Sequence, residues 1–207
     1  MVRAMRLTVY PDSSVRLVLP LFVTDTQAMQ FLQSKQSWLR GKVAAARERG
    51  EKQNVPLTDI LLFGERVRLK EYESLKGTGV AVFAGEIRLY LRPQTTEQQK
   101  RAVIDDYLRQ ELSKYLTVRV EYYRNLFGEA PVSWTIRKMK TEWGSCMARK
   151  RSLLFNLHLV HKPYELIDYV VVHELCHLQV QNHGPEFKRL LTERMPDWQQ
   201  RKKKLNE

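Results

Sequence analysis

A chain of 207 residues is long enough to bury a substantial core, as one domain or as two small lobes. Its two cysteines, Cys146 and Cys176, are too few for a secreted disulfide scaffold, so we expect a reducing, cytoplasmic location. No apolar run approaches the roughly 20 residues of a membrane-spanning helix, and the early apolar stretch 15–23 contains Arg16 and Pro20, which favours a strand over a leader peptide. The formal charge of +12 favours polyanionic partners, although solvated lysines and arginines explain it equally well.

The first half of the chain predicts a small, mostly antiparallel sheet with one helix. Apolar and polar residues alternate in 6–10 and 15–19 around the turn residues 11–14, which indicates a hairpin. From Thr24 or Asp25 as N-cap, apolar residues recur at helical spacing to about Gly50. Further strands are expected at 59–63, 80–83 and 86–91.

The second half predicts a more helical lobe. We place a lobe boundary near residue 94, giving a β-rich lobe at 1–94 and a catalytic lobe at 95–207, unless the two form one continuous domain. A capping box, either Thr95 with Gln98 or Thr96 with Gln99, starts a helix that reaches Leu116 or continues to a stop at Gly128. Strands at 132–138 and 152–159 precede a helix at 164–180, with Pro163 at its first position. The fold class is therefore α+β.

The helix at 164–180 carries the strongest functional signal. It is apolar on nearly every side and must be buried, where two imidazoles and a carboxylate require hydrogen bonds, ion pairs or a metal. His173 and His177 are four residues apart and share one helix face, which lets both bind one zinc ion. Glu174 completes a His-Glu-x-x-His motif and is expected to act as the base that activates water. The alternative is a core helix in which both histidines only satisfy local hydrogen bonds.

A third ligand is expected just after this helix. His183 can turn back toward the metal if the helix stops at Asn182, as a left-handed residue, before Gly184 and Pro185. Glu186 and Glu193 are rival ligands, because zinc also accepts carboxylates. The histidine spacing matches that of metzincins, but Val180 stands where they carry glycine, so the turn should differ.

Other polar residues near the motif receive weaker assignments. His158 and His161 could tune the site or stabilise an oxyanion, although a structural or surface role is the simpler interpretation. Cys176 is expected to be a buried, inert thiol. A basic cluster directly before the metal helix is either a phosphate clamp or a solvated loop. Its members are Arg137, Lys138, Lys140, Arg149, Lys150 and Arg151.

The segments 140–146, 154–159, 167–178 and 182–187 together resemble the YgjP-like metallopeptidase domain family, most specifically between about 136 and 190. The resemblance implies a zincin-like C-terminal lobe, zinc ligands at His173, His177 and His183, and a catalytic Glu174. The sequence departs from the family pattern at Glu142 and His158. The family is related to SprT-type metalloproteases, which act on proteins crosslinked to DNA, whereas some YgjP-like members are assigned hydrolysis of UTP to UMP and diphosphate.

Three functions follow from these observations. We favour a zinc hydrolase with one zinc ion that cleaves peptide bonds, with the substrate added beside an edge strand such as 152–159. The alternative is a nucleoside triphosphate pyrophosphatase, acting on UTP, in which Mg accompanies the substrate. A nucleic-acid-binding module with a structural zinc is the third, disfavoured because such zinc sites contain more cysteine. Weak nucleic-acid binding is compatible with catalysis, and no membrane partner is expected.

Overall fold

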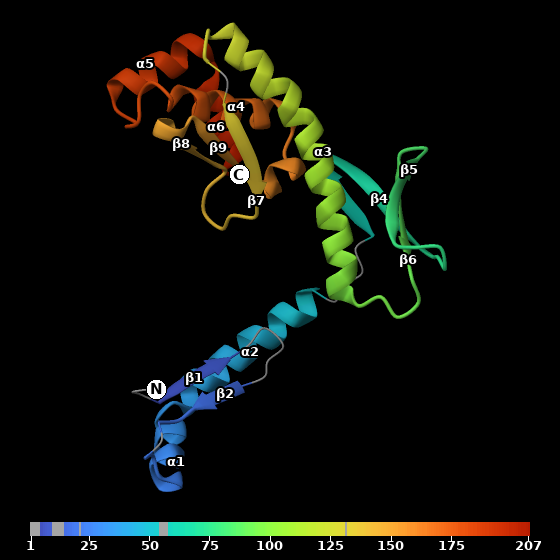
Figure 1. Ribbon diagram of the computed structural model, residues 1–207, viewed down its shortest axis with the longest axis vertical. Coiled ribbons are helices and arrows are strands. Elements are labelled where there is room, and N and C mark those ends of the chain that lie inside the picture. Colours follow the sequence, from blue (N-terminus) through green and yellow to red (C-terminus); the bar gives the residue numbers. More distant parts are fainter. Residues whose placement is uncertain (1–4, 10–14, 21, 54–57, 131) are drawn as a thin grey trace. The chain divides into compact units, whose positions relative to one another are not determined.

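A computed structural model describes residues 5–9, 15–20, 22–53, 58–130 and 132–207 (Figure 1). The chain has an α+β fold, which confirms the predicted class. It divides into two compact units, Met1–Pro56 and Leu57–Glu207. The predicted boundary near residue 94 lies inside the second unit, at the connection between a strand and a long helix.

The first unit combines a hairpin with two helices. Strands β1 (Arg6–Val9) and β2 (Val15–Val18) pair antiparallel, as predicted, and the turn at 11–14 lies outside the described residues. Helix α1 (Asp25–Ser34) begins at Thr24, whose side chain forms a capping box with Gln27, and α2 (Gln36–Gln53) follows. The prediction of a single helix is therefore wrong. The Ser34 hydroxyl donates back to the Phe31 carbonyl at 2.8 Å, a contact that bends helices.

The second unit begins with a four-stranded sheet in the order β3-β4-β6-β5. These strands are β3 (Asp59–Leu62), β4 (Glu65–Glu73), β5 (Gly79–Phe83) and β6 (Glu86–Leu91). The pairs are antiparallel except for β4 with β6, which is parallel. The sequence analysis missed β4, because charged residues occupy most of its positions and only Leu69 is fully buried.

The turn between β3 and β4 lies against Pro163, at the start of the predicted helix at 164–180. Phe63 and Gly64 both have positive φ, at 52° and 87°, the combination that a two-residue hairpin turn requires. A Cβ atom at Gly64 would lie 2.8 Å from Cγ of Pro163. Gly64 therefore serves both the turn and the close packing.

Helix α3 (Glu97–Leu126) connects this sheet to the rest of the unit. It begins at Thr96, where the second of the two predicted capping boxes forms with Gln99, and Gly128 follows its end with φ of 66°. The helix thus continues beyond Leu116, as the longer of the two predicted alternatives stated. Its apolar face explains why the poor helix formers near residue 118 do not break it. The buried positions recur every four residues, at Ile104, Leu108, Leu112, Leu116 and Val120.

A second, three-stranded sheet has the order β7-β9-β8. Its strands are β7 (Ser133–Arg137), β8 (Gly144–Met147) and β9 (Ser152–Asn156). Strand β9 pairs in parallel with β7 and antiparallel with β8, so β8 is an edge strand. The predicted strand at 152–159 ends early, because the Asn156 side chain accepts from the backbone of His158 at 3.1 Å and starts the short 3-10 helix η2 (Leu157–His161).

Three helices complete the unit: α4 (Tyr164–Cys176), α5 (Pro185–Arg194) and α6 (Trp198–Leu205). Pro163 is the N-cap of α4 and not its first residue, and the helix ends four residues before the predicted Val180. Asn182 is not among the described residues with positive φ, so the predicted left-handed stop there is wrong. The chain turns earlier, where the backbone N–H of Leu178 donates a hydrogen bond to the Leu175 carbonyl and that of Gln179 donates to the Cys176 carbonyl.

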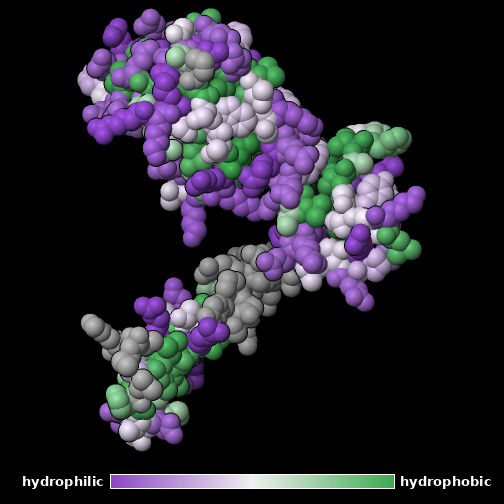
Figure 2. Space-filling view, in the orientation of Figure 1, coloured by the Kyte–Doolittle hydropathy of each residue, from purple (hydrophilic) through white to green (hydrophobic). Residues whose placement is uncertain are grey.

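One hydrophobic core joins both sheets to the helices of the second unit. Leu69 and Ile87 of the first sheet belong to the same cluster as Leu112 of α3 and Val171 of α4. Hydrophobic side chains also reach the visible surface near β5, where Val82 and Phe83 are 58% and 60% exposed (Figure 2). No helix among the described residues is both long enough and apolar enough to cross a membrane.

Candidate metal centre

Helix α4 holds two of the predicted ligands on one face. The helix is buried along most of its length between α3, α5, α6 and β8, which fixes the direction of its polar side chains. His173 and His177 lie one turn apart, and their Nε2 atoms are 3.2 Å from each other. Two imidazole nitrogens this close, without a counter-ion between them, suit a shared cation.

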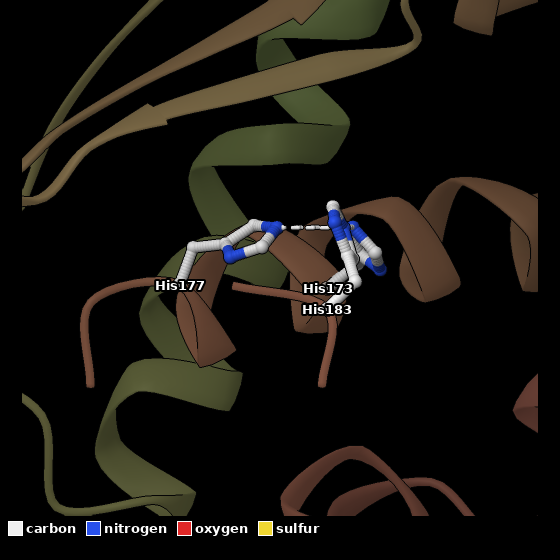
Figure 3. Close-up of side chains that lie close together, drawn as sticks. All are labelled: His173, His177 and His183. Atoms are coloured by element: carbon white, nitrogen blue, oxygen red, sulfur yellow. Dashed lines mark hydrogen bonds between the residues drawn. The ribbon is translucent and has the colours of Figure 1, made fainter. Parts of the chain in front are cut away.

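The third predicted ligand, His183, joins them from the loop between α4 and α5. Its Nε2 atom lies 3.0 Å from that of His173 and 3.1 Å from that of His177 (Figure 3). Ligand nitrogens around a tetrahedral zinc ion are roughly 3.3 Å apart, so the three histidines fit such an ion. Among the described residues, the group that could hold a metal is His173, His177 and His183, without the rival carboxylates Glu186 and Glu193.

Neighbouring groups hold the imidazoles in position. Nδ1 of His177 donates to the Val180 carbonyl at 3.0 Å, which leaves its Nε2 atom unprotonated and able to bind a metal. Nδ1 of His173 lies 3.5 Å from the Tyr169 hydroxyl. The ring of Phe187, near the start of α5, is buried against all three imidazoles at centroid distances of 4.5 to 4.9 Å. The local turn at Val180 thus contributes directly to ligand orientation.

The same surroundings keep the imidazoles of His173 and His177 neutral. Burial, together with repulsion from His177 and His183, lowers the pKa of His173 to about 3. Burial also lowers the pKa of His177. Neutral imidazole is the form that binds metal, so His173 and His177 need not lose a proton when they bind a metal ion at neutral pH.

Glu174 points into a tightly enclosed position next to this cluster. It is 4% exposed, and its Oε2 atom has no hydrogen-bond partner among the described residues. Burial, and then the charge of Glu142, raises the pKa of Glu174 to about 8. Strand β8 presses against it, because a Cβ atom at Gly144 would lie 2.5 Å from Oε1 of Glu174. A buried carboxylate with one oxygen unsatisfied is suited to exchange a proton with a ligand.

A cavity of about 870 Å³ opens over Glu174 and the three histidines. Its walls come from β8, the 3-10 helix η1 (Ala148–Lys150), α4, the loop 181–183 and α6. Arg149 and Lys150 of the predicted basic cluster line it, as do Glu142 and Lys202. The sequence analysis did not place Lys202 at this site, because only the packing of α6 against α4 brings it there.

The other members of the basic cluster lie outside the described lining of the cavity. Lys138 forms an ion pair with Asp105. Arg151 donates to the Ala130 carbonyl at 2.8 Å and pairs with Glu129 at 3.4 Å. Arg137 and Lys140 are exposed. The structure therefore brings together two of the six predicted substrate-binding cations.

Comparison with known proteins identifies the family. The model of the YgjP-like metallopeptidase domain matches residues 3–207. The chain belongs to this family. A search of curated proteins gave no match.

Two solved structures are similar to part of this YgjP-like chain. One is the zymogen of the metallopeptidase abylysin from Pyrococcus abyssi, with 19% identity and a TM-score of 0.41 over 44% of this chain and 90% of that one. The other is the zymogen of the metallopeptidase jannalysin from Methanocaldococcus jannaschii, with 22% identity and a TM-score of 0.39 over 44% and 92%.

The remaining polar residues near the motif have structural contacts in this YgjP-like domain. Nδ1 of His161 lies 2.7 Å from the Leu61 carbonyl, and the rings of His158 and His161 are 5.9 Å apart, outside the described cavity lining. Cys176 is fully buried, and burial raises its pKa to about 11. Cys146 lines the cavity, and burial raises its pKa to about 11 as well. Neither thiol is therefore poised to act as a thiolate at neutral pH.

Proposed function

We propose that this member of the YgjP-like family is a zinc-dependent peptidase. His173, His177 and His183 would hold one zinc ion, and Glu174 would act as the general base. The observation that carries the proposal is the unpartnered, buried carboxylate of Glu174 beside three converging imidazole nitrogens on the wall of an open cavity.

In this proposal, the zinc ion and Glu174 have separate roles in the reaction. When bound, zinc supplies a Lewis acid that polarises a carbonyl and makes water more acidic. Glu174 accepts a proton from the attacking water at Oε2, and the same oxygen then delivers it to the amine that leaves. Burial raises the pKa of Glu174, which helps the carboxyl group to hold the proton between the two steps. Gly144 leaves room for the carboxylate, and the β8 backbone holds it in place.

The arrangement of the second sheet supports a peptide substrate, with one correction to the sequence analysis. Strand β9 was expected to be the edge beside which a peptide adds, but it lies between β7 and β8. Strand β8 is the available edge, and its four residues line the cavity next to Glu174. A peptide paired with β8 would pass its backbone over the three histidines.

The same features weigh against a structural zinc in a nucleic-acid-binding module. Structural zinc ions are enclosed by four protein ligands, often cysteines. Here three histidines face a cavity of about 870 Å³, and a carboxylate without a partner lies beside them. The arrangement supports catalysis.

The proposal is tested by turnover of the zinc-loaded protein on two substrate classes. One is an unstructured protein, with and without DNA, and the other is a panel of nucleoside triphosphates that includes UTP with Mg. We expect cleavage of the protein that a zinc chelator abolishes and that zinc restores, without release of diphosphate. Zinc-dependent release of diphosphate with the protein left intact would instead make the chain a pyrophosphatase. Binding of DNA without any turnover would favour the nucleic-acid-binding module.

A further inference from the structure

Three cationic side chains face the cavity without a counter-ion. Arg149 and Lys150 lie on η1, and Lys202 lies on α6. Within the described ranges, none of the three forms an ion pair, although neighbouring cations such as Lys138 and Arg151 do. Cations that remain unpaired in the wall of a substrate cavity are available to bind an anionic group of the substrate.

Strand β8 separates charges of opposite sign. Glu142 lies two residues before Gly144, where the strand begins against Glu174. Arg149 and Lys150 come just after Met147, where the strand ends. Since a strand advances about 3.3 Å per residue, β8 leads over roughly 10 Å from the catalytic carboxylate to these cations.

Lys202 contributes a cation from another element of the cavity wall. It lies on α6, which packs against α4, and it lines the cavity together with Tyr169 and Leu205. The described lining of the cavity therefore presents cations from both η1 and α6, together with the carboxylate of Glu142.

We propose that Arg149, Lys150 and Lys202 bind acidic side chains of a peptide that lies along β8, so that the substrates are acidic peptide segments. This proposal rests on the proposed peptidase function. The length of β8 separates Arg149 and Lys150 from Glu174, which suits a carboxylate that lies along an extended peptide, away from the scissile bond. A triphosphate gathers its charge in one place, next to the carboxylates of Glu142 and Glu174 that also line the cavity.

The charge order along β8 also predicts where the acidic residue lies. Antiparallel pairing is slightly more stable than parallel pairing, so we expect the peptide to run opposite to β8. Its residues that reach Arg149 and Lys150 are then the third and fourth before the scissile bond. Acidic residues just after the scissile bond face Glu142 and are disfavoured.

The test begins with a neutral peptide whose cleavage point is mapped by mass spectrometry. Glutamate is then placed singly at each position from four before to three after that point, and kcat/KM is measured against the matching glutamine peptide. We expect glutamate at the third or fourth position before the bond to raise kcat/KM by about tenfold at low salt, and the gain to shrink at high salt. Equal values for glutamate and glutamine at every position would overturn the proposal.

Paired variants assign the effect to the three cations. Arg149→Gln with Lys150→Gln, and separately Lys202→Gln, should lower the ratio of kcat/KM between the glutamate peptide and the matching glutamine peptide. Lys140→Gln and Lys203→Gln are matched controls, since both residues are exposed and lie outside the described cavity lining. A gain that survives in both cavity variants, or that disappears equally in the controls, would contradict the assignment.

A binding measurement separates this proposal from the proposed function. The zinc-loaded Glu174→Gln protein should bind a fluorescent peptide with glutamate more tightly than the matching peptide with glutamine. Adding Lys202→Gln to this protein should weaken binding of the glutamate peptide only. This preference can be observed even if no peptide is hydrolysed, so the failure of one proposal is distinguishable from the failure of the other. Tight binding of UTP with no preference between the two peptides would overturn the acidic-peptide proposal.

Discussion

At the scale of single residues, Gly144 leaves room for the carboxylate of Glu174, the proposed general base. A Cβ atom there would lie 2.5 Å from Oε1 and 2.8 Å from Cγ of Glu174, so Gly144→Ala must displace that side chain. A displacement of about 1 Å at a catalytic group lowers rates on the order of 100-fold. We therefore expect Gly144→Ala to lose kcat/KM by this factor while binding zinc normally, and Ser145→Ala to be nearly neutral. Full activity of Gly144→Ala would show that Glu174 does not need its observed position.

The buried imidazoles give the metal-free protein a defined pH dependence. The pKa of His173 falls from 6.5 to about 3 on folding, so the unfolded chain takes up a proton first as the pH drops. The contribution of His173 to the stability of the metal-free protein should thus be fully present above about pH 6.5 and decline below it, by at most about 1.4 kcal/mol per pH unit, whereas the raised pKa of Glu174 gives a slope of opposite sign. Urea unfolding of the metal-free protein and of its His173→Gln variant between about pH 7 and pH 5 isolates the contribution of His173 as the difference between the two profiles. Identical pH profiles for the two proteins would refute the assignment.

The sequence predicted the residues of the site that follow from local spacing. His173 and His177 are one helical turn apart, and the stop before Pro185 lets His183 return, so all three could be proposed without a structure. Gly144 and Lys202 could not, because each reaches the site through contacts between elements that are distant in sequence. Only the folded structure shows that Lys138 forms an ion pair with Asp105, whereas Lys150 lines the cavity.

At the scale of elements, a buried polar network joins α3 to α4, the helix that carries His173 and His177. Arg119 donates to both carboxylate oxygens of Asp168, at 2.8 and 2.5 Å. The hydroxyls of Tyr115 and Tyr123 donate to the same carboxylate at 2.8 and 3.1 Å. Asp168 lies five residues before His173 on α4, so the network fixes the rotation of the helix that carries the ligands.

Breaking this network should destabilise the second unit. Asp168→Asn leaves the half-buried guanidinium of Arg119 without its counter-ion, and we expect a loss of about 3 kcal/mol in the free energy of unfolding. Urea denaturation measures the loss. The double variant Arg119→Met with Asp168→Leu should recover much of it, because no unpaired charge remains. A change below about 1 kcal/mol in Asp168→Asn would show that the ion pair contributes little.

Elements with a clear apolar pattern were predicted well, and those defined by pairing were not. Helix α3 follows from its capping box and its apolar repeat at every fourth residue. Strand β4 is rich in charge and β8 has four residues, so neither offers a pattern without its neighbours. Strand β9 was expected to be an edge, because its sequence cannot reveal that the unpredicted β8 pairs beside it.

At the scale of the whole molecule, the core lies in one of the two units. The members of the hydrophobic cluster begin at Ile60 and end at Leu205, within the described part of residues 57–207. A chain shortened to 57–207 should therefore fold cooperatively and bind one zinc ion. Near-ultraviolet circular dichroism and zinc content measure both properties. A shortened chain that lacks fixed tertiary structure would show that the first unit contributes to the stability of the second.

The most direct test of the central claim compares the zinc-loaded protein with its Glu174→Gln variant on one mapped peptide. The substitution keeps the size of the side chain and removes its ability to accept a proton. We predict equal zinc content, one ion per chain, and a fall in kcat/KM on the order of 1000-fold. A variant that holds its zinc and retains activity within about tenfold of the wild type would contradict the assignment of Glu174 as the general base.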